Sequence, residues 1–241
     1  MAVTPVSASS IQRTVMISGA NRGIGRAIAE RCLLDGHRLS LGCREPHGLD
    51  ASPFGQQEAV ACFPYEARDP QTASTWVRAS VERFGAVDAL VNAAGALASV
   101  PFLFEPGADA AIRELFDINV MGPWWLSRAA WPHLAASGHG RVVNLVSMSG
   151  KRVKGSMAAY PVSKFALLGL GQAMRNSGWD AGIRVTSLCP GWVNTDMAAG
   201  KGVPAAAMAQ PQDLAELVAT LLRLPNAAVP HEIACNCILE P

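Results

Sequence analysis

Tyr160 and Lys164, within the segment YPVSK, are the residues whose types and spacing most directly suggest chemistry. Residues four positions apart share one face of a helix, so the phenol and the ammonium can converge on one point. Pro161 fits a helix only near its start, which predicts that Tyr160 lies in the first turn. A nearby ammonium favours the phenolate and lowers the pKa of tyrosine from its ordinary value of about 10. The pair is therefore predicted to act as a general acid and base. The alternative is a surface pair without a function.

Ser147 ends the apolar run 142–147, thirteen residues before Tyr160. The carboxyl ends of parallel strands are where such sheets bind ligands, so this serine is expected to join the same site. A serine hydrolase also places its nucleophile after a strand, but it needs a glycine where this chain has Leu145. We therefore exclude the hydrolase.

A glycine-rich turn, SGANRGIG at residues 18–25, connects the first apolar run to an amphipathic segment. Its glycines permit positive φ and a close approach of the backbone to a ligand. The helix N-terminus that follows offers unpaired N–H groups to a pyrophosphate. The spacing lacks the GK[ST] of a nucleotide-hydrolysing loop, and a glycine turn that binds nothing is the alternative. The predicted cofactor-binding residues of this turn are Gly19, Asn21, Arg22, Gly23, Ile24 and Gly25.

The end of the second apolar run indicates which dinucleotide is bound. Enzymes that use NAD commonly place an acidic residue there, hydrogen-bonded to the ribose 2′-hydroxyl. This chain has Gly42-Cys43-Arg44 instead, and Arg44 together with Arg22 offers paired donors to a 2′-phosphate. We therefore predict that the cofactor is NADP rather than NAD. Two solvated loop arginines are the alternative, and Glu45 could still contact a ribose hydroxyl.

The elements that position these residues are short apolar runs alternating with amphipathic segments, such as the helical stripes 24–33 and 214–222. Continuous apolar strands between helices indicate a parallel sheet covered on both faces. No repeat or low-complexity linker divides the chain. We predict one doubly wound, Rossmann-like α/β domain over residues 13–241, after a flexible tail at 1–12. The predicted strands are Thr14–Ser18, Arg38–Cys43, Ala59–Phe63, Ala89–Asn92, Arg141–Ser147, Arg184–Cys189 and Glu232–Cys237.

These motifs, in this order, resemble the short-chain dehydrogenase/reductase family in its single-domain form of about 250 residues. The resemblance runs from about Thr14 to Glu240 and includes the glycine turn, where Ser18 replaces the usual threonine. It also includes NAAG at residues 92–95, YxxxK at 160–164 and PGWVNT at 190–195. The cofactor contacts that the resemblance implies, beyond the glycine turn and Arg44, are Glu66, Asn92, Gly95, Tyr160, Lys164, Pro190, Gly191, Val193 and Thr195.

Asn119 is the fourth catalytic residue that the resemblance implies. It shares a helical stripe with Ile112, Leu115 and Phe116, so its amide occupies a position patterned for burial and needs partners. Local backbone could satisfy this amide. The resemblance implies instead that Asn119 holds a water linking Lys164 to bulk solvent.

The resemblance implies an oxidoreductase that transfers hydride between a nicotinamide and the carbonyl or alcohol of a small, mainly apolar substrate. In that scheme Ser147 orients the carbonyl, Tyr160 delivers the proton and Lys164 holds the nicotinamide ribose. The pocket is expected to be apolar, with Lys201 as the exception and segment 197–210 as a lid. The expected substrate residues are Met148, Ser149 and Trp192. The alternatives are a non-catalytic NADPH-sensing regulatory protein, and a racemase or lyase on the same scaffold.

Composition excludes several other classes of protein. The 241 residues include 20 basic and 19 acidic side chains, a net charge of +1, which argues against nucleic-acid binding. No run approaches the ~18 apolar residues of a membrane helix, and the first ten residues lack the pattern of a secretory signal. The six cysteines show neither metal nor disulfide spacing, so we expect a cytoplasmic protein without a metal.

The helices beginning near Ala111 and Tyr160 have apolar faces that predict a homodimer. The chain lacks the Gly-Gly pair common at the family's last strand, which leaves a tetramer in doubt.

Overall fold

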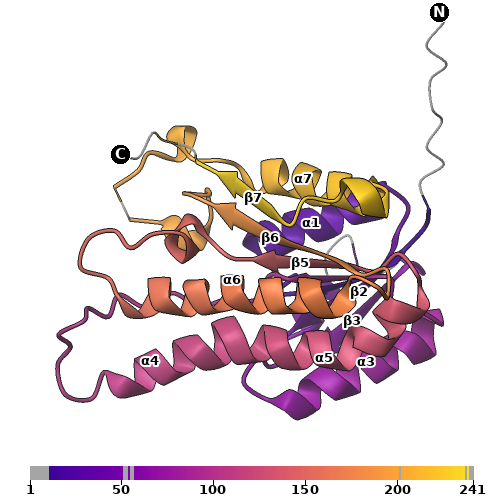
Figure 1. Ribbon diagram of the computed structural model, residues 1–241, viewed down its shortest axis with the longest axis horizontal. Helices are drawn as coiled ribbons and strands as arrows, with labels where there is room; N and C mark the ends of the chain where they lie inside the picture. Colours follow the sequence, from indigo (N-terminus) through magenta and orange to yellow (C-terminus); the bar gives the residue numbers. More distant parts are fainter. Residues whose placement is uncertain (1–10, 51–53, 55–56, 201, 237, 239–241) are drawn as a thin grey trace, which may run out of the picture.

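The computed structural model describes residues 11–50, 54, 57–200, 202–236 and 238. Its seven strands form one sheet in the order β3-β2-β1-β4-β5-β6-β7, and every neighbouring pair is parallel (Figure 1). The predicted doubly wound, Rossmann-like fold is confirmed. The strand order reverses between β1 and β4, and ligands of such sheets bind at that point. The strands are β1 Thr14–Ser18, β2 Arg38–Cys43, β3 Val60–Pro64, β4 Ala89–Asn92, β5 Arg141–Leu145, β6 Arg184–Pro190 and β7 Glu232–Cys235.

The predicted bounds of β1, β2 and β4 are confirmed, and those of the other strands differ by one or two residues. The largest difference in the site concerns β5, which was predicted to include Ser147 and ends at Leu145. Val146 still donates its N–H to Leu188 O, at 2.8 Å, but the chain then turns into the 3₁₀ helix η2 (Met148–Gly150). The predicted last strand extended to Cys237, which lies outside the described residues, as do residues 1–10 of the predicted tail.

Helices cover both faces of the sheet, because the strands between them are apolar on both sides. One face packs against α1 (Gly23–Leu34), the short α2 (His47–Asp50) and α7 (Pro211–Arg223). The other packs against α3 (Pro70–Phe84), α5 (Gly122–Ala136) and α6 (Ala159–Gly178). The two buried apolar clusters account for the high apolar content of the chain. Three 3₁₀ turns follow η2 along the described chain: η3 (Asp196–Ala198), η4 (Ala205–Ala207) and η5 (Asn226–Ala228).

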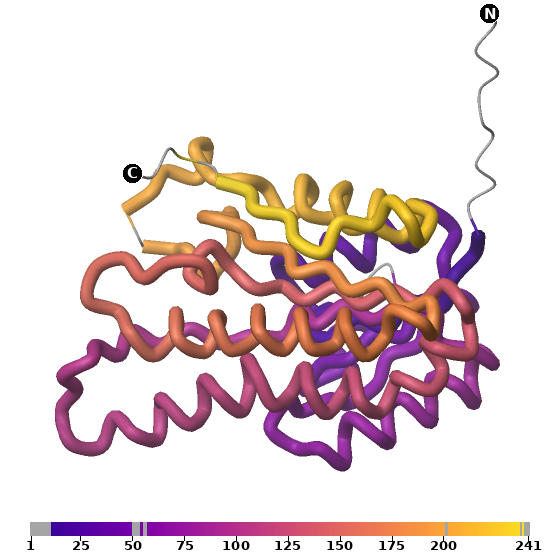
Figure 2. The backbone as a smooth tube through the Cα atoms, in the orientation of Figure 1, coloured from indigo at the N-terminus to yellow at the C-terminus, as the bar shows by residue number. Residues whose placement is uncertain are grey.

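A π-helical turn, η1 (Asp117–Met121), connects α4 (Asp109–Phe116) to α5. The three segments follow one another without a break and run as one long helical trace beside α6 (Figure 2). The extra residue in a π turn shifts the faces of the helix, and such turns occur frequently at functional sites. Asn119 is in the middle of this turn and is fully buried.

A row of polar side chains crosses the sheet at its carboxyl edge. In the register of the strands, Ser18 of β1 pairs with Asn92 of β4, which pairs with Asn144 of β5, which pairs with Ser187 of β6. All four are buried. The ends of these strands are therefore aligned, and the loops that follow them begin along the same edge of the sheet, on the side of the molecule where the long loops lie (Figure 1).

Candidate active site

The glycine turn after β1 has the geometry of a ligand cradle. Gly19 and Gly23 have φ of 70° and 56°, in the region that favours glycine. A Cβ on Gly19 would lie 2.9 Å from the backbone of Ala94, and one on Gly25 would collide with the carbonyl of Gly19. No side-chain hydrogen bond caps the start of α1 at Arg22, so the first N–H groups of the helix are available to an anion. These residues fit a dinucleotide pyrophosphate.

A cavity of about 360 Å³ extends from this turn across the carboxyl ends of β1, β2, β3 and β4. It contains most of the residues predicted from the sequence to hold the cofactor. Those that line it are Gly19, Asn21, Arg22, Gly23, Ile24, Gly25, Arg44, Glu66, Gly95 and Thr195.

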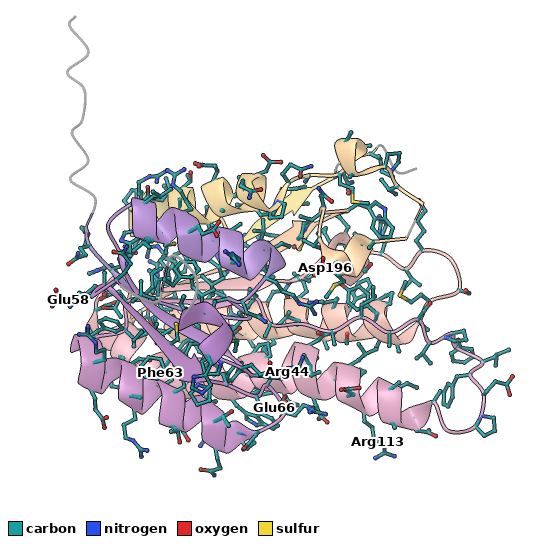
Figure 3. The ribbon with its side chains drawn as sticks, turned by 180° about the vertical axis from the view of Figure 1, so that it is seen from behind. Arg44, Glu58, Phe63, Glu66, Arg113 and Asp196 are labelled. Carbon is teal, nitrogen blue, oxygen red and sulfur yellow. The ribbon has the colours of Figure 1, made fainter. Side chains whose placement is uncertain are left out.

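Arg22 and Arg44 line this cavity from different elements. The Arg22 guanidinium donates to a carboxylate oxygen of Asp196 at 3.3 Å, and both side chains are exposed. An exposed ion pair of this kind contributes little stability, so it leaves Arg22 able to bind another anion. Arg44 follows β2 directly and is exposed beside Glu66, on the face of the molecule shown in Figure 3.

Glu66 is held by Arg68, a residue that the sequence reasoning missed. The Arg68 backbone N–H and its Nε both donate to Glu66 Oε1, at 3.1 and 3.2 Å, and Nη2 donates to Oε2 at 3.1 Å. These bonds, with a smaller contribution from Arg44, lower the pKa of Glu66. Arg68 also lines the cavity. The sequence did contain a signal for this contact, because a cation, Arg68, stands two positions after the acidic Glu66 near the end of a strand.

Asn92 was predicted as a cofactor contact, but it lines neither this cavity nor the second one described below. It is buried, and its Nδ2 donates to Asn144 Oδ1 at 2.8 Å and to Ser127 Oγ at 3.1 Å. The structure therefore places Asn92 in the polar row beneath the site, where it holds strands together.

Ser147, Tyr160 and Lys164 come together at the carboxyl end of β5. Tyr160 is the second residue of α6, as Pro161 predicted, and Lys164 lies one turn later with Nζ 5.8 Å from the Tyr160 ring centroid. The Lys164 ammonium donates to Leu145 O at 2.9 Å. Ser147 has φ of 155°, the only positive φ among the described non-glycine residues, and its Oγ accepts from Ser149 N at 3.0 Å. Strained backbone of this kind is concentrated at functional sites.

The predicted lowering of the Tyr160 pKa by Lys164 is not found. Burial raises the pKa of Tyr160, opposed only by its hydrogen bond with the Ser147 side chain. Burial also lowers the pKa of Lys164, to about 8. Both shifts have the same cause, because a buried site disfavours charge on the phenol and on the amine alike. At neutral pH Tyr160 therefore carries its proton.

Asn119 is satisfied by groups distant in the sequence, the backbone of Ala96 and the side chain of Ser163, rather than by local backbone, and the water implied by the resemblance stays a prediction. Its Oδ1 accepts from Ala96 N at 2.9 Å, while Nδ2 donates to Ala96 O and to Ser163 Oγ, both at 3.0 Å. Ser163 in turn donates to Tyr160 O at 2.8 Å. Asn119 thus connects the loop after β4 to the first turn of α6, where Tyr160 lies.

A second cavity, of about 310 Å³, opens beyond Ser147 and Tyr160. It shares Ile24, Gly95 and Thr195 with the first, so the two cavities adjoin. The predicted residues that line it are Ser147, Met148, Ser149, Tyr160, Lys164, Pro190, Gly191, Trp192, Val193 and Thr195.

The expectation of a pocket with no anchor for an anion except Lys201 is wrong. Arg152 and Lys154 line the second cavity, because the segment between η2 and α6 passes beside it. Lys201 lies outside the described residues. Arg152 and Lys154 were not predicted to line the pocket, because no periodicity marks the residues around them.

The model of the short chain dehydrogenase family matches residues 13–203, which include every residue that lines the two cavities. The chain belongs to this family. Members use a nicotinamide cofactor, and the glycine cradle described above fits one.

Known relatives agree with this assignment. The chain is 39% identical over 228 residues to the agropine synthesis reductase of Rhizobium rhizogenes, an alignment that covers 94% of this chain and 53% of that protein. The chain thus spans about half the length of that relative. It is 30% identical to the oxidoreductase UcpA of Escherichia coli strain K12, with 87% of each chain covered. A short-chain dehydrogenase/reductase of Brucella melitensis superposes with a TM-score of 0.84 at 28% identity, over 96% of this chain and 99% of that one.

Among the described residues, no group of three or more His, Cys, Asp or Glu side chains could hold a metal ion. None of the described helices is long and apolar enough to cross a membrane.

The buried ammonium of Lys164 predicts a specific pH dependence of stability. The folded pKa of about 8 lies below the ordinary 10.5, so between these values the unfolded chain binds a proton that the folded one lacks. Stability rises with pH over this window, by about 3 kcal/mol at ~1.4 kcal/mol for each pH unit. Urea unfolding of wild type and Lys164→Met should show the wild type gaining this amount relative to the variant between pH 7 and pH 10.5. A difference that does not change with pH would contradict it.

Proposed function

We propose that this chain is an NADP(H)-dependent carbonyl reductase or alcohol dehydrogenase with Tyr160 as its acid and base. The observation that carries the proposal is the protonated, half-buried phenol of Tyr160 beside the Ser147 hydroxyl, in a cavity that adjoins the one lined by the glycine cradle. The proposed substrate is a small carbonyl or alcohol compound, enclosed mainly by the apolar side chains of the second cavity.

The protein residues have separate roles in the proposed reaction. The Ser147 hydroxyl donates to the substrate oxygen and orients it. Tyr160 transfers its proton to the same oxygen as negative charge develops there. When bound, the reduced nicotinamide supplies the hydride. Lys164 binds the ribose hydroxyls of that cofactor, and its positive charge compensates for the loss of the phenolic proton.

Protonation of Tyr160 supports this assignment in the direction of reduction. A phenol that keeps its proton at neutral pH has a proton to donate to a carbonyl oxygen. Donors already aimed at the developing oxyanion cost little reorganisation during the reaction. Asn119 is a positioning residue in this scheme, because it acts through Ser163 and the start of α6.

The proposed preference for NADP rests on Arg22 and Arg44. Both guanidinium groups line the cofactor cavity, and no acidic residue ends β2, where an NAD-dependent enzyme commonly has one. Guanidinium groups bind phosphate through paired donors.

A homodimer is part of the proposal and is supported by exposed apolar side chains on neighbouring helices. Trp124 on α5 and Val162 and Phe165 on α6 are between 41% and 50% exposed. Apolar groups of this size exposed together commonly mark an interface. The cytoplasmic location stays a prediction from the sequence.

The first test replaces Tyr160 with Phe. Because only the hydroxyl is lost, kcat for carbonyl reduction should fall by about 10³-fold or more, the contribution of a positioned proton donor. The dissociation constant for NADPH, measured by fluorescence titration, should change by less than about threefold. Turnover retained by the variant would overturn the role of Tyr160.

The second test concerns the cofactor. The variants Arg22→Gln and Arg44→Gln should each raise KM for NADPH by about 10-fold, allowing for the exposure of both side chains, and leave KM for NADH nearly unchanged. Arg26→Gln is the matched control, because Arg26 pairs with Glu30 and does not line the cavity. Equal kcat/KM with NADPH and NADH in the wild type would contradict the proposed preference.

A further inference from the structure

The segment between η2 and α6 has a fixed position beside the substrate cavity. At its start, Arg152 N–H donates to Met148 O at 3.2 Å. At its end, Met157 forms an antiparallel bridge with Pro101, and Ala158 N–H donates to Val100 O at 2.9 Å. Because both ends are anchored, the side chains between them are presented to the cavity by the fold itself.

This segment carries three cations, Lys151, Arg152 and Lys154. Lys151 Nζ lies 2.5 Å from a carboxylate oxygen of Glu232 on β7, an ion pair that raises the pKa of Lys151. Arg152 is half-buried and Lys154 is exposed, and both line the substrate cavity together with Ser147 and Tyr160 of the proposed site. Two positive charges therefore border the cavity in which the carbonyl would bind.

The charge of this cavity is of one sign. Among the described residues that line it, the charged ones are Arg152, Lys154 and Lys164, and none is Asp or Glu. Lys164 lies deep in the site and donates to Leu145 O. A cleft lined by one sign of charge with apolar walls concentrates the opposite charge. The apolar walls here include Leu97, Met148, Met157, Pro161 and Trp192.

We propose, on the basis of the reductase function above, that the substrate is an anionic carbonyl compound. Its carbonyl lies between Ser147 and Tyr160, its apolar part contacts the walls, and its carboxylate or phosphate group binds Arg152 and Lys154. Recognition of an anion by these two cations makes them specificity-determining residues, which do not touch the reacting atoms. The substrate is thus apolar only in its middle, between two polar ends.

The test compares acids with neutral analogues of the same shape. The carboxylate probes are phenylglyoxylate, acetylbenzoate and levulinate, each paired with its own methyl ester. The phosphate probe is dihydroxyacetone phosphate, paired with dihydroxyacetone. Reduction is followed by the loss of NADPH and, separately, NADH absorbance.

The wild type should prefer an acid to its neutral partner by at least about 10-fold in kcat/KM, as expected for a charge-assisted contact. The pair with the larger ratio shows which anion is bound.

Variants of the two cations test where the preference originates. The double variant Arg152→Gln/Lys154→Gln should lower the acid-to-neutral ratio by about 30-fold if both contacts are made. The charge-conserving double variant Arg152→Lys/Lys154→Arg should keep most of the preference, which a merely structural role would not predict. Arg78→Gln, on the exposed face of α3, is the matched control and should leave the ratio unchanged.

The outcomes separate this inference from the proposed function. Reduction of the neutral compounds in preference to the acids, or an acid preference that survives the double Gln variant, overturns the anionic substrate and leaves the reductase intact. No reduction of any probe with either cofactor overturns both.

Discussion

The buried polar row across the sheet is the constraint on which the site depends. Ser18 Oγ accepts hydrogen bonds from Ala93 N and Ala94 N, both at 3.1 Å, so it ties the end of β1 to the loop after β4. Asn92 bonds to Asn144 in the next strand. A buried polar group that loses its partner costs free energy, so a slip of one strand against another is disfavoured here. The row thereby aligns the end of β1, where the glycine cradle begins, with the end of β5, where the loop that contains Ser147 begins.

The buried ammonium of Lys164 depends on that alignment. Its partner, Leu145 O, follows Asn144 of the row directly, so the position of β5 determines where the ammonium is held. A Cβ on Gly95 would lie 3.3 Å from Asn119 Oδ1 and 3.6 Å from Lys164 Nζ, which shows how closely the loop after β4 encloses the amine. Exclusion of water raises the pKa of Tyr160 and lowers that of Lys164, and the same exclusion strengthens every hydrogen bond to a developing oxyanion.

Local patterns predicted much of this arrangement, and tertiary contacts determined the rest. The strands and the first turn of α6 follow from apolar runs and from Pro161, because these signals act within a few residues. The strained backbone of Ser147 and the π turn at Asn119 have no comparable signal, since both arise where loops and helices from distant parts of the chain meet. The same holds for Arg68 and Lys154, whose place in the cavities depends on how their loops fold. The predicted pKa shift of Tyr160 had the wrong sign because the sequence reveals charge spacing but not burial.

In the proposed function, this site transfers hydride between a bound nicotinamide and a carbonyl, and the chain supplies the proton. The most direct measurement uses NADPH deuterated at the transferable position of the nicotinamide and mass spectrometry of the alcohol product. We predict one deuterium at the carbinol carbon, matched by one oxidised cofactor for each product molecule. An alcohol without deuterium, or cofactor that binds and is never oxidised in the presence of carbonyl compounds, would contradict the account and favour a sensor or a non-redox enzyme on this fold.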